Sequence, residues 1–237
     1  MNDSGSKIMN VINKIGTAIM VNLLFLVSCI PIITIGAAWS ALYSAVRYTI
    51  RGDGWFQGYK EGFKANFGRN TLIWVADLVL IYFTLDHFLY YLEYLVGGYG
   101  TEPMAIVMTV ISGTLLLAGL LFLAAVIPIN LYIPTDANQS VTNAWDMVLH
   151  APLQVLGVAA LMWLPVFLAL FFTNLAFQII MVFVAAYFVV AGVIMTMLLK
   201  APLIRILQLQ RKRDGIEWNP QRDEDEDEDE EEEEEED

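Results

Sequence analysis

The sequence predicts an all-α protein, a polytopic bundle of transmembrane helices. Two long runs without a charged side chain are the main evidence: 53 residues between Asp146 and Lys200, and 33 between Glu102 and Asp136. About 20 apolar residues in a helix cross the hydrocarbon core of a bilayer, so these runs alone have room for roughly three spans. The composition agrees, because 57% of the residues are hydrophobic and only 16% are charged.

Six apolar segments are expected to form the bundle: Ile8–Ile30, Ile35–Ile50, Asn70–Leu95, Pro103–Ile133, Pro152–Thr173 and Phe177–Ile204. Pro31 lacks a backbone donor and disfavours helix at Ile30, so we interpret Pro31–Gly36 as a turn between the first two segments. The fold then has about six spans, or five if those two segments form one broken span. The second segment is short and contains Arg47, which favours a tilted helix with this side chain at the interface, or a re-entrant segment.

The basic residues favour six spans with the N- and C-termini in the cytoplasm. In that arrangement all 13 Lys and Arg residues lie at or inside the cytoplasmic face, as expected for membrane proteins in general. Five spans would place Lys7 and Lys14 outside.

The chain divides into a transmembrane helical domain, residues 1–215, and a disordered polyacidic tail, residues 216–237. The last 15 residues, from Asp223 to Asp237, are all acidic, and without them 11 acids face 13 bases. Successive acids repel one another and stay solvated. The tail is either a solvating extension or a binder of the protein's own basic residues, of a basic partner or of divalent ions.

Two cytoplasmic loops are expected to contain short amphipathic helices. In the first, four aromatic residues recur every four positions and share one helical face: Trp55, Tyr59, Phe63 and Phe67. Lys60, Glu61 and Lys64 point elsewhere. Such a helix either lies in the membrane interface or packs under the bundle with its aromatic rings in the core. The second loop has a fainter version of the pattern, around Trp145.

Ionisable residues within a span are costly and are treated as functional candidates. The third segment contains four of them: Asp77, Asp86, His87 and Glu93. We expect Asp77 to form a structural ion pair with Arg47, which lies at a similar depth on a helix close in sequence. This structural interpretation also places Glu93 and His87 at the outer interface and Asp77 near the inner one. The alternative is a role of Asp86 in handling a proton or a substrate.

Common catalytic and metal-binding patterns are missing from the sequence. With one cysteine, Cys29, and two histidines, a zinc site is not expected. The chain lacks H-E-x-x-H, G-x-S-x-G and the phosphate-binding G-x-x-x-x-G-K-[ST] motif. We therefore expect no enzyme activity, no cofactor, no metal and no nucleic-acid partner.

The stretch from Asn22 to Tyr43 reads NLLFLVSCIPIITIGAAWSALY. Its parts are an opening Asn22-Leu-Leu, a Pro31-Ile-Ile-Thr34-Ile-Gly36 turn and a small-residue helix with Ala-Leu-Tyr43, followed further on by Phe-Lys-Ala-Asn-Phe at residues 63–67. In these motifs the chain resembles the YesL family of bacterial integral membrane proteins, a domain of unknown function. The resemblance covers roughly residues 8–88; the second half is similar only in hydropathy.

The resemblance implies that the protein lies in the bacterial plasma membrane. It also implies a link to sugar uptake, because the family is commonly associated with carbohydrate-utilisation and ABC sugar-transport genes. We therefore expect an accessory or regulatory component of carbohydrate uptake, with the lipid bilayer and ABC-type sugar transporter components as partners. No catalytic residues carry over from the family. The alternative is a small secondary transporter that uses the intramembrane acid Asp86.

Overall fold

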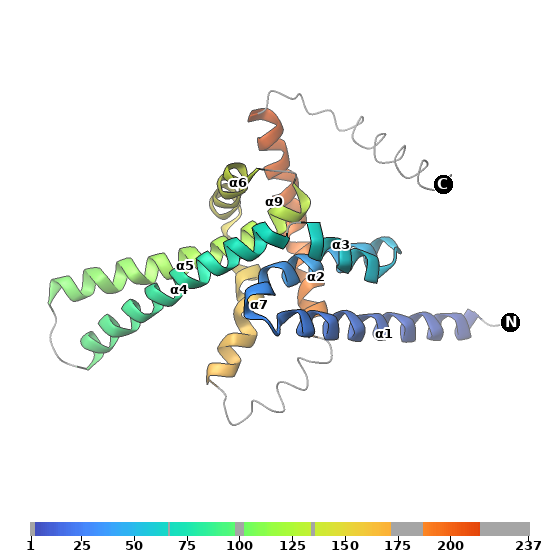
Figure 1. The fold of residues 1–237 in the computed structure, drawn as a ribbon, viewed down its shortest axis with the longest axis horizontal. Coiled ribbons are helices and arrows are strands. Elements are labelled where there is room, and N and C mark those ends of the chain that lie inside the picture. The colour runs from blue at the N-terminus through green and yellow to red at the C-terminus, as the bar shows by residue number, and fades with distance from the viewer. Residues whose placement is uncertain (1–2, 66, 98–101, 134–135, 172–186, 214–237) are drawn as a thin grey trace.

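The computed structural model describes residues 3–65, 67–97, 102–133, 136–171 and 187–213, and within these ranges every regular element is helical (Figure 1). The all-α prediction is therefore confirmed. The elements are α1 (Asp3–Cys29), the 3-10 helix η1 (Ile32–Thr34), α2 (Ile35–Arg51), α3 (Trp55–Ala65), α4 (Phe67–Val96), α5 (Pro103–Tyr132), α6 (Ala137–His150), α7 (Pro152–Phe171) and α9 (Phe188–Arg213).

The predicted turn after the first segment is present and is shorter than expected. Pro31 precedes η1, and the Thr34 hydroxyl donates hydrogen bonds to the carbonyl oxygens of Ser28, at 2.6 Å, and Pro31, at 2.8 Å. The first of these bonds occupies a carbonyl that the end of α1 leaves free, because Ser28 lies in the last turn of that helix. Because α2 already begins at Ile35, Gly36 belongs to its first turn rather than to the connection.

Helix α2 is the centre of the fold. Every residue from Gly36 to Val46 is buried, and α2 packs against α1, α3, α4, α5 and α9. An aromatic cluster closes one side, where the Phe25 ring lies 5.0 Å from Trp39 and 4.6 Å from Phe188 of α9. The second segment is thus enclosed by protein along most of its length. A tilted or re-entrant course of this segment in the membrane stays a prediction.

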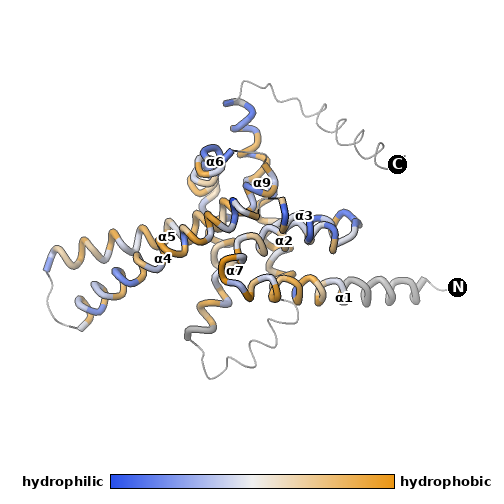
Figure 2. The backbone as a smooth tube through the Cα atoms, viewed as in Figure 1, coloured by the Kyte–Doolittle hydropathy of each residue, from blue (hydrophilic) through white to orange (hydrophobic). Residues whose placement is uncertain are grey.

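Helices α4 and α5 form a long hairpin that projects to one side of the molecule (Figure 1). Each has 30 residues, or about 45 Å at the usual rise per residue. Figure 2 shows hydrophobic residues along most of the hairpin. The half of the hairpin nearer to α2, here called its inner half, contacts α2, α6 and α7. Only this half lies within the body of the protein.

Three helices are long and apolar enough to cross a membrane: α4, α5 and α9. A fourth span results if α6 and α7, which are bent by 107° at their junction, are counted together. The structure therefore supports a membrane protein with three or four spans among the described residues. The six-span count and the cytoplasmic termini stay predictions.

The last helix is longer than the sequence indicated. Helix α9 continues through Pro202 to Arg213, whereas the expected segment ended at Ile204. Prolines also lie inside α5 and α7, because a helix packed against neighbours can accommodate the lost hydrogen bond. The predicted boundary near residue 174 and the polyacidic tail lie outside the described residues.

Candidate functional site

Three residues of the Asn22–Tyr43 motifs, here called signature residues, make contacts between helices. Asn22 is buried, and its side-chain oxygen accepts a hydrogen bond from the Phe188 N–H at the start of α9, at 3.2 Å. The Tyr43 hydroxyl donates to the sulfur of Met195, also on α9, at 3.3 Å. Gly36 lies so close to α4 that a Cβ there would be 2.6 Å from the Asn70 carbonyl oxygen. These residues therefore determine how α1, α2, α4 and α9 pack.

Helix α3 is fixed on α2 by two glycines that the sequence analysis missed. A Cβ at Gly58 would lie 2.6 Å from the Tyr48 ring, and one at Gly62 would lie 2.9 Å from the Ser40 carbonyl oxygen. Neither position has room for a side chain. The spacing Gly-x-x-x-Gly, which lets two helix backbones approach closely, was the signal available in the sequence.

The predicted aromatic face is divided between two helices. Trp55, Tyr59 and Phe63 lie on α3, whereas Phe67 is the first residue of α4. Tyr59 is 4% exposed and its hydroxyl donates to the Ser28 hydroxyl of α1, at 2.9 Å. Tyr59 thus packs against the bundle, as one of the two interpretations expected. Trp55 and Phe63 are partly buried, while Phe67 is exposed.

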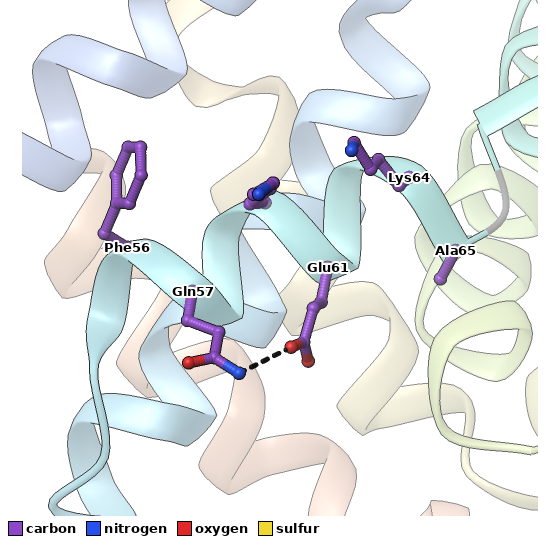
Figure 3. Close-up of a pocket in the computed structure, with 6 residues that line it drawn as sticks. Phe56, Gln57, Glu61, Lys64 and Ala65 are labelled. Carbon is purple, nitrogen blue, oxygen red and sulfur yellow. Dashed lines mark hydrogen bonds between the residues drawn. The ribbon is translucent and has the colours of Figure 1, made fainter.

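The opposite face of α3 points away from the protein (Figure 3). Phe56 is 58% exposed there, next to Lys60 and Lys64, around a shallow open depression. The Tyr48 hydroxyl and the Gln57 amide donate hydrogen bonds to the Glu61 carboxylate. These bonds, the one from Tyr48 foremost, hold the pKa of Glu61 below its usual value.

A chain of hydrogen-bonded side chains connects four helices in the core. The Asn70 amide donates to the Ser40 hydroxyl, and the Asn130 amide donates to the Asn70 side-chain oxygen at 2.7 Å. The Ser140 hydroxyl donates to the Asn130 side-chain oxygen. All four side chains are buried. Because they come from α2, α4, α5 and α6, this polar cluster fixes the relative position of these helices.

A second row of polar contacts joins α6 to the end of α9. The Asn143 amide donates to the Gln210 side-chain oxygen at 2.9 Å, and both residues are buried. Arg213 donates to the Asn143 side-chain oxygen and lies 3.4 Å from the Asp146 carboxylate. The ion pair is partly exposed and contributes little, so the buried amide pair is the main link.

The expected ion pair between Arg47 and Asp77 does not form. The Arg47 guanidinium lies over the Tyr132 ring, 5.5 Å from its centroid, where cation and ring attract each other. Asp77 is buried on α4, and its Oδ2 atom has no hydrogen-bond partner. The two residues are on neighbouring helices, but the rotation of α2 directs Arg47 toward α5.

The other ionisable residues of the third segment are exposed and do not gather with Asp77. Asp86, His87 and Glu93 all lie in the outer part of α4. The Nδ1 atom of His87 is 3.0 Å from the Phe83 carbonyl oxygen of the preceding turn. In the described part of the chain, no three His, Cys, Asp or Glu side chains come together in a way that could hold a metal ion.

Comparison with known proteins supports a family assignment for part of the chain. Residues 18–86 match the profile of a family described as "Protein of unknown function, DUF624". The match extends from α1 through α2 and α3 into α4, the region where most of the signature contacts lie. It covers less than a third of the chain, and the name YesL stays a prediction. The chain has no significant match among curated proteins or among solved structures.

Proposed function

We propose that this protein is an accessory or regulatory component of carbohydrate uptake in the bacterial plasma membrane. It acts by binding another membrane complex rather than by catalysis. The partner class, ABC-type sugar transporter components, comes from the resemblance of residues 8–88 to the YesL family. The structure supports the coarser part of the proposal, a helical membrane protein with a domain of unknown function.

The exposed face of α3 is the feature of the structure that best supports the proposed binding of a partner. One side of this 11-residue helix is fixed on α2 by Gly58 and Gly62, while the other presents Phe56, followed by Lys60 and Lys64 on the next two turns. Aromatic residues are enriched in surfaces that recognise a partner, and Lys60 and Lys64 add positive charge to this one. Because α3 is held by close backbone contacts, this face needs little ordering when it binds, which favours affinity.

Affinity purification from the host membrane in mild detergent tests the proposal. The wild-type protein is expected to recover sugar-transporter subunits, and the variant Lys60→Glu/Lys64→Glu is expected to lose them. Arg205→Glu, a charge reversal at an exposed position of α9, is the control and keeps the recovery. Recovery of no transporter subunit by the wild type contradicts the proposal, as does equal recovery by the Lys60→Glu/Lys64→Glu variant.

A small secondary transporter is the second candidate, and one observation favours it. Among the described residues, the buried acid is Asp77, whereas Asp86, on which the sequence-based hypothesis rested, is exposed. Flux of labelled sugar into proteoliposomes, lost in Asp77→Asn and kept in Asp86→Asn, would favour transport. If the wild type shows no flux, the transporter function is contradicted and the accessory function is the candidate that remains.

A further inference from the structure

Asp77 is a carboxyl group enclosed between α4 and α5. Its side chain is 7% exposed, and Oδ2 is buried without a hydrogen-bond partner. On α5, Gly119 faces it, and a Cβ there would be in van der Waals contact with Oδ1, at 3.5 Å. One turn away on α4, the Trp74 ring stacks on Trp163 of α7, with ring centroids 6.0 Å apart.

No positive charge of the described residues compensates this carboxyl group. Helices α5 and α7 contain no charged residue at all. Arg47, on α2, lies over the Tyr132 ring, and Arg69, two turns away on α4, is 3.4 Å from the Asn130 carbonyl oxygen. Tyr43 of α2 donates its hydroxyl to Met195 rather than to the acid.

A lone ionised carboxylate in such surroundings is very costly, because the low-dielectric interior replaces water and offers no counter-charge. A metal cation is a poor solution, since it requires several oxygen ligands and Asp77 supplies one carboxylate among apolar neighbours. A proton removes the charge without further ligands. We propose that Asp77 is a proton-binding site inside the α4–α5 hairpin.

Infrared spectroscopy of the full-length protein in lipid bilayers tests the proposal directly. The wild-type minus Asp77→Asn spectrum is expected to contain the C=O band of one protonated carboxyl group in apolar surroundings. Spectra are recorded from about pH 5 to about pH 9, on either side of neutrality. The band is lost completely in Asp77→Asn and is kept in Asp86→Asn, which removes an exposed acid of the same helix.

A difference spectrum with only ionised carboxylate bands at every pH overturns the proposal. It is also overturned if the band disappears in Asp86→Asn instead, because the proton then resides on the exposed acid. Should Asp77→Asn fail to fold, site-specific isotope labelling of the wild-type Asp77 carboxyl assigns the band by its frequency shift. Proton binding at Asp77 requires no partner protein, so its failure and that of the accessory function are separate results.

Discussion

The two halves of α4 differ in burial, so that acidic residues of one helix lie in different environments. In the inner half, which packs on α2 and α5, Asn70, Trp74 and Asp77 are buried. Beyond Thr84 no described residue of α4 is buried, and the hairpin projects away from the other helices (Figure 1). Asp77, in the inner half, is buried in the protein, while Asp86, in the outer half, is exposed. Position along the helix therefore decides which acid is a candidate for function.

The largest effect is expected where α2 and α3 touch. Gly62→Val places a branched side chain against the backbone of Ser40, which lies 2.9 Å from the position of the new Cβ. Because backbone cannot move aside easily, we expect destabilisation by about 3 kcal/mol or more, at the upper end of overpacking costs. Melting of the purified protein in bilayer discs measures it. Gly54→Val is the control, since nothing lies within 4 Å of that position; an equal loss in both variants contradicts the packing.

The polar cluster is expected to give the next largest effect. Asn70→Ala removes two buried hydrogen bonds, the one that Asn70 donates to the Ser40 hydroxyl and the one that it accepts from the Asn130 amide. The expected cost is about 1–3 kcal/mol. In a double-mutant cycle with Asn130→Ala the two losses should not add, because the side chains share one network. Strict additivity would show that the cluster does not act as a unit.

The start of α9 is expected to depend on Asn22 to a smaller extent. Asn22→Ala removes the side-chain oxygen that accepts the Phe188 N–H, and the loss of a capping interaction typically costs about 1 kcal/mol. Hydrogen exchange followed by mass spectrometry should show faster exchange in the first turn of α9. Unchanged exchange there would contradict the capping function of this signature residue.

The smallest effect concerns Glu61 on the outward face of α3. Tyr48→Phe removes the hydrogen bond that contributes most to the lowered pKa of Glu61, so this pKa should rise toward its usual value. A lowered folded-state pKa stabilises the protein above the unfolded-state pKa, and this contribution disappears as the pH falls through the folded-state value. The exposed position keeps the contribution small. Carboxyl NMR titration with labelled Glu measures the shift, and Gln57→Ala should shift the pKa less.

The helices themselves could be predicted because apolar runs and prolines mark them. The boundaries of α2 and α5 agree with the expected segments within one residue. The enclosure of α2 could not be predicted, because its small residues, such as Ala37, Ala38 and Ala41, suit a lipid-facing helix and a core helix equally well. The close approach of α3 and α4 to α2 shows that α2 is a core helix rather than a lipid-facing one.

The contacts of the candidate site depend on helix rotation, which hydropathy does not encode. The sequence predicts similar depths for Arg47 and Asp77, yet Arg47 faces Tyr132. Asn70 and Asn130 are 60 positions apart, and nothing local indicates that their side chains meet. Gly58 and Gly62 were within reach of sequence analysis, since their spacing alone predicts a close helix contact.

Helix α2 is a core helix enclosed by its neighbours, whereas the α4–α5 hairpin projects to one side with exposed apolar side chains. An apolar carbene-generating reagent dissolved in the bilayer tests this on the unmodified protein, because it labels only side chains in contact with lipid. Labels are expected on exposed residues of the hairpin, such as Leu72, Val79 and Phe83, and none on residues 36–46. Labelling of α2 as strong as that of the hairpin would contradict it.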